Sequence, residues 1–229
     1  MNTIGLLGGM SWESTEVYYR LINEETRRLL GGLHSARIVM VSVDFQEIEK
    51  LQHEGNWVAT GNILAEHARQ IESAGADFLL ICTNTMHKVA DQVSAAIHIP
   101  LLHIADATAK RIRETGIGTV GLLGTRFTME QDFYQGRLQQ HGLKVLVPSA
   151  EDRETVHRVI YDELCLGKVE PESRDAFLDI IDKLTAQGAT AIIEGCTEIG
   201  MLVEQEHTEV TLFDTTRIHA EQAVALALK

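Results

Sequence analysis

The chain has 229 residues, of which 45% are hydrophobic and 23% charged, and its formal net charge is −13. This negative charge argues against nucleic acid as a partner, because phosphates require clustered Lys and Arg. No apolar segment approaches the ~20 residues of a membrane span, and the N-terminus begins with a strand pattern instead of a basic signal segment, so we expect a cytoplasmic protein that binds no membrane. The three cysteines indicate neither a disulfide framework nor a zinc site.

Short apolar runs that alternate with helical patterns predict buried parallel strands. In chain order these runs are Ile4–Leu7, Ile38–Val43, Phe78–Ile81 and Leu101–Ile104, then Val120–Leu123, Val145–Val147, Ala191–Ile193 and Val210–Phe213. The fold class is therefore α/β, with two pseudo-symmetric lobes that are each a mostly parallel sheet flanked by helices. We expect lobe one to comprise residues 1–104 plus 215–229, and lobe two residues 105–214.

An internal repeat supports the division into two lobes. Thr3–Gly8 returns almost unchanged as Thr119–Gly124, and Gly75–Thr85 matches Gly188–Glu198. The second match sets Thr83 opposite Cys196. If the two lobes face each other, these residues lie on opposite sides of an active-site cleft, which suits chemistry on two faces of one carbon.

Helix-start patterns occur at equivalent places in the two halves. Ser11 is expected to cap a helix that contains Tyr18 and Ile22, and Thr128 with Gln131 forms a capping-box pattern in lobe two. After the last strand of each half, we expect a helix to begin at a turn that contains Asp106 or Asp214.

The segment Gly8–Ser11 connects the first strand to the first helix. Backbone N–H groups in such a place can bind an anion, for example a carboxylate. The segment lacks the spacing of a dinucleotide fingerprint and the lysine of a Walker loop. A tight turn that needs small residues explains the glycines equally well.

Polar residues follow two buried strands at equivalent points of the repeat. These segments are Thr83-Asn84-Thr85 and Cys196-Thr197-Glu198. Open α/β sheets bind ligands beyond the carboxyl ends of their strands. A cysteine after a strand is more often a small buried hydrophobe, but the repeat makes Cys196 a functional candidate. Cys82 should point to the opposite face from Thr83 and belong to the core.

Cys165 lies on an amphipathic pattern that ends near Gly167, and we expect it to be structural. Lys168 follows this glycine. It is either a solvated cation at a helix end, where the dipole favours it, or a carboxylate ligand that reaches into the cleft. Periodicity alone assigns nothing to Gln52.

The chain resembles the cofactor-independent aspartate/glutamate racemases along essentially its whole length. The resemblance rests on Ile4–Met10, the Asn84-Thr85-x-His87 signature and Gly195–Glu198. It implies an enzyme without a cofactor, usually a homodimer, that takes a small-molecule amino-acid substrate. It also implies a cysteine from each lobe beside the α-carbon, so that one thiolate removes a proton and the opposite thiol delivers another.

This sequence carries Thr83 where relatives usually carry a cysteine. By resemblance, Cys196 is the base for L-substrates and Thr83 lies on the opposite face, as in the subgroup of L-aspartate/glutamate-specific racemases. A hydroxyl is a far weaker acid than a thiol, so the two directions should be unequal.

The arginine that relatives often place after the second strand is also missing, since no Arg occurs between Arg37 and Arg69. The subgroup pattern puts Gln52 in its role. The resemblance then implies a substrate-binding set of Met10, Gln52, Asn84, Thr85, Lys168, Thr197 and Glu198.

Three alternatives within the same two-lobed superfamily stay open: a hydantoin racemase, a maleate isomerase and a decarboxylase of malonate-like acids. A decarboxylase can work with one catalytic thiol, and this chain has one at the two key places. A non-catalytic protein that binds acidic amino acids is a further alternative.

Overall fold

The computed structural model describes all residues from Met1 to Lys229 and divides them into two compact units. Unit 1 comprises Met1–Ile104 and His219–Lys229, and unit 2 comprises Ala105–Ile218. We predicted that the C-terminal part of lobe one starts at residue 215, but residues 215–218 cluster with unit 2. The Oγ1 atom of Thr215 donates a hydrogen bond to the carbonyl of Glu194 at 2.7 Å, which ties the start of this segment to unit 2.

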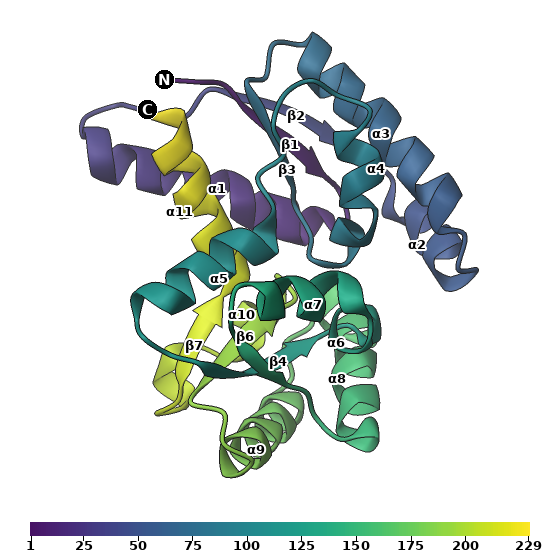
Figure 1. Cartoon of the computed structure of the whole chain (residues 1–229), viewed down its shortest axis with the longest axis vertical. Coiled ribbons are helices and arrows are strands. Elements are labelled where there is room, and N and C mark those ends of the chain that lie inside the picture. The colour runs from purple at the N-terminus through teal and green to yellow at the C-terminus, as the bar shows by residue number, and fades with distance from the viewer. The chain divides into compact units, whose positions relative to one another are not determined.

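Unit 1 contains a three-stranded parallel sheet in the order β2-β1-β3 (Figure 1). Its strands are β1 (Ile4–Gly8), β2 (Ile38–Ser42) and β3 (Phe78–Ile81). Its helices are α1 (Trp12–Leu30), α2 (Phe45–His53), α3 (Trp57–Ser73), η1 (Thr85–Val89), α4 (Ala90–Ser94) and most of α11 (Thr215–Ala227). The predicted cap of α1 is confirmed, because the side chain of Ser11 accepts the N–H of Ser14 at 3.3 Å.

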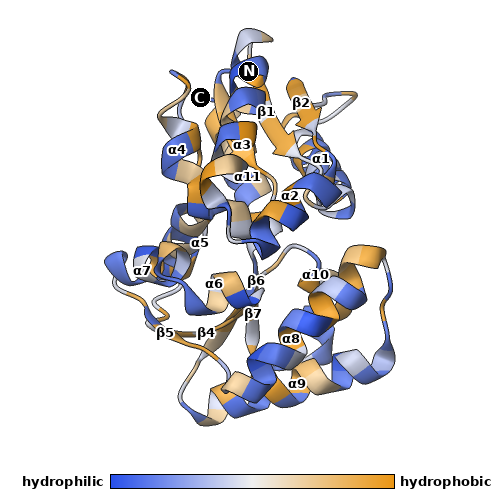
Figure 2. Cartoon of the chain, turned by 90° about the vertical axis from the view of Figure 1, so that its right-hand side faces the viewer, coloured by the Kyte–Doolittle hydropathy of each residue, from blue (hydrophilic) through white to orange (hydrophobic).

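Helices cover both faces of the unit 1 sheet. Ile4 and Leu6 of β1 pack in a cluster with α1 and α11, whereas Leu7 packs with α2, α3 and α4. Because both faces are buried, β1 is hydrophobic along its length, and the strands of this sheet are largely orange in Figure 2. Leu21 of α1 and Leu64 of α3 belong to the two opposite clusters.

The predicted strand Leu101–Ile104 is wrong beyond its first residue. Leu101 forms a single bridge with Leu79, and helix α5 already begins at Ile104, two residues before Asp106. The backbone N–H of Ile104 donates to Nε2 of His87 at 3.3 Å instead of joining the sheet. The apolar run therefore ends at the start of α5, because the His87 side chain, and not a neighbouring strand, accepts the backbone hydrogen bond of Ile104.

Unit 2 contains a four-stranded parallel sheet in the order β5-β4-β6-β7. Its strands are β4 (Thr119–Gly124), β5 (Lys144–Leu146), β6 (Ala191–Gly195) and β7 (Thr211–Asp214). Its helices are α5 (Ile104–Glu114), α6 (Arg126–Glu130), α7 (Asp132–Gln140), α8 (Ala150–Asp162), η2 (Leu164–Leu166), α9 (Pro171–Ala186), α10 (Ile199–Leu202) and η3 (Gln205–His207). The predicted α/β class with parallel sheets flanked by helices is confirmed.

Helices α8 and α9 cover one face of the unit 2 sheet. Val156 and Ile160 of α8 and Phe177 of α9 pack with Leu123 and Ile192 of the sheet. Both helices alternate between hydrophilic and hydrophobic colours in Figure 2, as expected for helices with one buried face.

Two predicted helix boundaries in unit 2 are wrong. Thr128 lies inside α6, whose N-cap is Thr125, and Oγ1 of Thr125 accepts the N–H of Thr128 at 3.4 Å. Helix α8 ends at Asp162, so Cys165 lies on the separate turn η2, which Gly167 ends with a φ of 70°. At the start of α6, Thr125 and Thr128 could both serve as the cap, and Thr125, which directly follows β4, does so.

The repeated glycines have a packing role in both units. A Cβ atom on Gly5 would lie 2.5 Å from Cγ2 of Ile71 on α3, and one on Gly121 would lie 2.6 Å from Cδ1 of Ile192. Gly5 and Gly121 are equivalent in the repeat. Each sheet therefore needs a glycine in its central strand where side chains approach closely.

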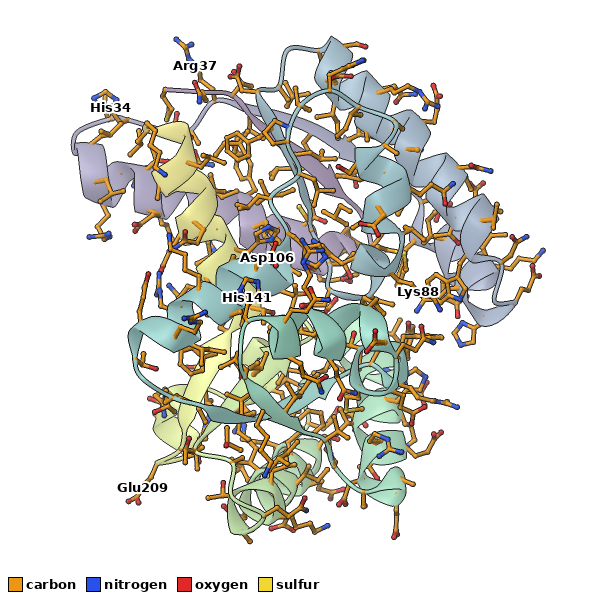
Figure 3. All side chains as sticks on the ribbon, in the orientation of Figure 1. His34, Arg37, Lys88, Asp106, His141 and Glu209 are labelled. Carbon is orange, nitrogen blue, oxygen red and sulfur yellow. The ribbon has the colours of Figure 1, made fainter.

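Asp106 of α5 contacts α7 within unit 2. Its carboxylate accepts two hydrogen bonds from Arg137, both at 2.7 Å, and lies 2.9 Å from Nε2 of His141 (Figure 3). Burial opposes ionisation of this carboxyl group, but the contacts with Arg137 and His141 lower its pKa on balance. Asp106 is thus a structural ion-pair residue.

None of the helices combines the length and apolar character needed to cross a bilayer.

Candidate functional site

The Thr83-Asn84-Thr85 segment begins two residues after the last residue of β3, at the carboxyl end of the unit 1 sheet. All three side chains are buried or nearly so, and Thr85 begins the short helix η1. Cys82 packs in the core with Phe78 and Leu80, which confirms that it faces away from Thr83. Burial raises the pKa of the Cys82 thiol, so it is protonated at neutral pH.

Hydrogen bonds from two elements fix the backbone of this segment. Oγ of Ser14, in the first turn of α1, donates to the carbonyl of Cys82 at 3.0 Å. Nδ1 of His87 lies 2.8 Å from the carbonyl of Thr83, and its Nε2 accepts the N–H of Ile104. Because Nε2 is an acceptor, the ring proton is on Nδ1 and is donated to Thr83. Sequence reasoning missed both supports, although His87 was visible as part of the signature.

Met10 and Gln52 come from the segments that follow two neighbouring strands, β1 and β2. Met10 follows β1 and is 3% exposed, and Gln52 is in the last turn of α2, which follows β2, and is 1% exposed. Gln52 shares a helix face with Ile48, one turn earlier, which belongs to the core. Met10 and the Thr83–Thr85 segment therefore lie at the carboxyl ends of β1 and β3, and Gln52 lies on the helix that follows β2.

Cys196, Thr197 and Glu198 follow β6 at the corresponding edge of the unit 2 sheet. The carboxylate of Glu198 turns back, and its Oε2 accepts a hydrogen bond from Sγ of Cys196 at 2.9 Å and another from Oγ1 of Thr197 at 2.6 Å. The expected contact of Glu198 with substrate stays a prediction, and in the structure its carboxylate contacts Cys196, Thr197 and Cys165.

The environment of Cys196 keeps its thiol protonated. Burial raises the pKa most, and the negative charge of Glu198 and the nearby Cys165 raise it further. The charged group in contact with the thiol is the carboxylate of Glu198, an anion that disfavours the thiolate.

A second buried carboxyl group lies two residues before Cys196. Glu194 is 4% exposed, is the register partner of Asp214 on β7, and its Oε1 has no hydrogen-bond partner. Burial, followed by repulsion from Asp214 and Glu204, raises the pKa of Glu194 well above its ordinary value. Glu194 is therefore held as a neutral acid over a range of pH in which an exposed glutamate is ionised.

Cys165 and Lys168 lie close together in sequence but in different environments. Sγ of Cys165 lies 3.8 Å from Oε1 of Glu198, so this cysteine contacts the candidate site, which its expected structural role did not suggest. Lys168 is exposed immediately after Gly167, and its backbone N–H donates to the carbonyl of Glu163 at 3.0 Å. Its role as a carboxylate ligand stays a prediction.

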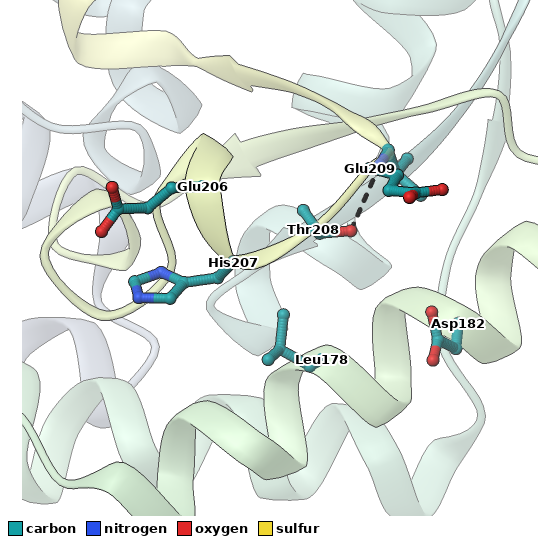
Figure 4. Close-up of a pocket in the computed structure, with 7 residues that line it drawn as sticks. Leu178, Asp182, Glu206, His207, Thr208 and Glu209 are labelled. Atoms are coloured by element: carbon teal, nitrogen blue, oxygen red, sulfur yellow. Dashed lines mark hydrogen bonds between the residues drawn. The ribbon is translucent and has the colours of Figure 1, made fainter.

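A surface pocket of about 520 Å³ lies elsewhere in unit 2 (Figure 4). It is lined by Leu178, Asp182, Glu206, His207, Thr208, Glu209 and Val210. None of the predicted site residues contributes to it, and its acidic lining would repel an acidic substrate. It is therefore separate from the candidate site.

Unit 2 also contains two buried hydroxyls that the sequence reasoning did not select. Oγ1 of Thr125, directly after β4, lies 3.2 Å from Oγ1 of Thr128. β4 is hydrogen-bonded to β6, which ends just before Cys196, so these hydroxyls are at the same sheet edge as the thiol. The repeat could have indicated them, because Thr125 follows Gly124 as Gly9 follows Gly8.

A parallel α/β fold with a Gly-Cys-Thr-Glu segment at the carboxyl end of a buried strand is the arrangement expected from the resemblance to racemases, which are isomerases. The chain belongs to the Asp/Glu/Hydantoin racemase family, whose sequence model matches residues 7–223. The family resemblance that the motifs indicated is thereby confirmed.

Three relatives illustrate the extent of the similarity. A crystal structure from Yersinia pestis, provisionally described as an Asp/Glu racemase, is 55% identical with a TM-score of 0.93, and each chain covers 100% of the other. An aspartate racemase homologue from Pyrococcus horikoshii is 33% identical with a TM-score of 0.87, again with 100% of both chains covered. The broad specificity amino-acid racemase RacX from Bacillus subtilis is 23% identical over 233 residues, which cover 98% of each chain.

Proposed function

We propose that this chain racemises aspartate and glutamate without a cofactor and with a preference for the L-enantiomers. In this proposal Cys196 removes the Cα proton of an L-substrate, and Thr83 acts on the opposite face. The observation that carries the proposal is that Cys196 and Thr83 occupy equivalent places of the repeat, each within two residues of the carboxyl end of a buried parallel strand.

The chemistry requires an acid and a base on opposite sides of a planar carbanion. Sulfur takes the Cα proton, and the electron pair of the C–H bond is delocalised into the α-carboxylate. A proton delivered from the other face gives the opposite enantiomer. The Thr83 hydroxyl can donate this proton, and the oxyanion that it leaves recovers a proton from solvent water.

Several candidate residues suit the substrate's charges. Gln52 and the hydroxyls of Thr85 and Thr197 can donate hydrogen bonds to carboxylates, and Lys168 adds a cation in a protein of net charge −13. Glu198 cannot attract a carboxylate, so any contact it makes with substrate would be with the ammonium group. Met10 and Asn84 complete the proposed set.

Initial rates with a panel of acidic and neutral amino acids would determine the substrate range. Bacillus subtilis RacX is described as a broad specificity amino-acid racemase, whereas the motif pattern of this chain is that of enzymes specific for acidic amino acids. We expect turnover of L-aspartate and L-glutamate to exceed that of neutral L-amino acids.

The test is hydrogen exchange at Cα. The purified protein is incubated in deuterated water with L-aspartate or L-glutamate and no added cofactor, and deuterium at Cα is followed by NMR together with the appearance of the D-enantiomer. Binding without exchange would support a non-catalytic acidic amino-acid binding protein instead.

A decarboxylase of malonate-like acids is the second candidate, because Cys196 is the one thiol at the two key places of the repeat. Release of carbon dioxide from an α-substituted malonate, without exchange on amino acids, would favour it. We also propose a homodimer, which sedimentation or light scattering would detect as twice the mass of the 25.4 kDa chain.

A further inference from the structure

Three proton donors converge on the carboxylate of Glu198. Oε2 accepts hydrogen bonds from Sγ of Cys196 at 2.9 Å and from Oγ1 of Thr197 at 2.6 Å, while Sγ of Cys165 lies 3.8 Å from Oε1. The Glu198 side chain is itself 3% exposed. A buried carboxylate in direct contact with a thiol is placed to accept the thiol proton.

The Cys196 thiol needs such an acceptor if it is to act as a base. Burial and the neighbouring anion raise the thiol pKa, so the resting side chain carries its proton. A protonated thiol cannot remove a proton from Cα. The proton must leave sulfur before or while sulfur attacks the substrate, and Oε2 of Glu198 is the contacting acceptor.

We propose that Glu198 takes the proton of the Cys196 thiol during turnover, so that the working base is the Cys196–Glu198 pair. This proposal rests on the proposed racemase function. The S–H bond of Cys196 breaks and an O–H bond forms on Oε2 of Glu198, and the sulfur lone pair then takes the Cα proton as a new S–H bond. The C–H electron pair stays on the substrate, and Glu198 releases its added proton to solvent water at the end of the cycle.

A purely electrostatic role for Glu198 makes the opposite prediction. If the carboxylate only holds the thiol in its protonated form, then removing its charge raises the amount of thiolate at neutral pH and makes Cα exchange faster. If the carboxylate accepts the proton, then removing its basicity makes exchange slower. The sign of the rate change separates the two roles.

The experiment compares wild type with Glu198→Gln and with Glu194→Gln as a matched control. Glutamine at position 198 keeps the size of the side chain and can accept the S–H hydrogen bond, but it cannot take the proton. Glu194 is also a buried glutamate near the end of β6, and its charge interactions are with Asp214 and Glu204, not with a thiol. Cα exchange of L-aspartate and the pH midpoint of thiolate ultraviolet absorbance are measured for each protein, with Cys196→Ser as the spectral baseline.

For Glu198→Gln we expect exchange at least about 100-fold slower, because general acid–base partners typically contribute 10²–10⁴ in rate. The pH midpoint of thiolate absorbance should fall, because a like charge next to the thiol has been removed. Glu194→Gln should keep exchange within about threefold of wild type.

Four results would overturn the proposal. They are unchanged or faster exchange in folded Glu198→Gln, an unshifted thiolate midpoint, an equal loss in Glu194→Gln, and a wild type without any exchange. The last of these overturns the proposed function together with the relay, whereas the first three, found with an active wild type, overturn the relay alone.

A measurement on wild type covers the case in which Glu198→Gln does not fold. If Glu198 takes the proton within the turnover step, kcat for L-aspartate stays level well below the pH at which the free thiolate appears. If the thiolate must form beforehand, kcat rises about tenfold per pH unit up to that midpoint, and the relay is wrong.

Discussion

Nδ1 of His87 donates a hydrogen bond to the carbonyl oxygen of Thr83 at 2.8 Å, while Nε2 of the same ring accepts the backbone N–H of Ile104. His87 is 3% exposed, so both contacts are buried. One side chain thus holds the backbone of a predicted acid–base residue and the first residue of α5. Its place in the Asn84-Thr85-x-His87 signature is explained by this double contact.

His87→Ala should therefore reduce both stability and turnover. It leaves a buried carbonyl and a buried N–H unsatisfied, and each costs about 1–3 kcal/mol of unfolding free energy. Urea unfolding and initial rates with L-aspartate measure the two effects. His34→Ala, at an exposed histidine that is labelled in Figure 3, is the control, and a His87→Ala protein as stable as this control would contradict the positioning role.

The two buried cysteines after strands should respond differently to substitution. Cys196→Ser should remove nearly all racemisation and Cα exchange of L-aspartate and L-glutamate, since a hydroxyl is a much weaker base than a thiol under the same conditions. Cys82→Ala should keep most of both, because Cys82 packs in the core of unit 1. An equal loss in a folded Cys82→Ala protein would show that the assignment of the chemistry to Cys196 alone is wrong.

Most strands could be predicted because a strand covered on both faces is apolar along its length, as in β1 and β6. The same rule wrongly predicted a strand at Leu101–Ile104. The end of this segment is buried, but the backbone N–H of Ile104 donates to His87 and not to a strand. The wrong N-cap at Thr128 has a similar origin. Thr125 and Thr128 both have a hydroxyl that can cap a helix, and Thr125 is the cap because α6 begins directly after β4 ends.

The positions of the candidate residues at the ends of strands could be predicted better than the electrostatics around them. Repeat alignment led to Thr83 and Cys196, since equivalent segments follow equivalent strands. The contact of Glu198 with Cys165 joins residues 33 positions apart, and no local pattern encodes it. The raised thiol pKa depends on this three-dimensional burial and on the direction in which Glu198 turns, so sequence periodicity could not give its sign.

Lys168→Ala should impair acidic substrates more than neutral ones. The lysine is exposed and follows Gly167, and it supplies a cation that a carboxylate can reach. A lost charged hydrogen bond is expected to lower kcat/KM for L-aspartate by roughly tenfold or more. The ratio of kcat/KM between L-aspartate and a neutral amino acid measures the effect, and an unchanged ratio would identify Lys168 as a solvated cation at a turn.

Glu194→Gln should stabilise the protein increasingly as the pH rises. The folded state raises the pKa of Glu194, so from the unfolded value of about 4.5 upward the unfolded chain releases this proton while the folded chain keeps it. Stability is therefore lost with rising pH until the folded group also titrates, by about 1.4 kcal/mol for each pH unit within that window.

Urea unfolding of wild type and Glu194→Gln between pH 5 and pH 8 tests this linkage. The free energy of unfolding of the variant relative to wild type should increase with pH, since glutamine has no proton to lose. A difference that is constant across this range would mean that Glu194 ionises in the folded protein as it does in the unfolded chain.

The predicted asymmetry of the site depends on Thr83. With a hydroxyl at this position, Cys196 can remove the proton of an L-substrate, whereas a D-substrate presents its proton to a group that does not readily become a base. Thr83→Cys places a thiol there and should raise the initial rate with D-aspartate or D-glutamate relative to the L-form. The equilibrium between enantiomers cannot change, so initial rates from each pure enantiomer and Cα exchange are the measurements.

Thr83→Ser is the control, because it keeps a hydroxyl and should leave the ratio of D to L rates close to that of wild type. Equal D and L rates in wild type, or an unmoved ratio in Thr83→Cys, would show that the chain does not work with a single thiol.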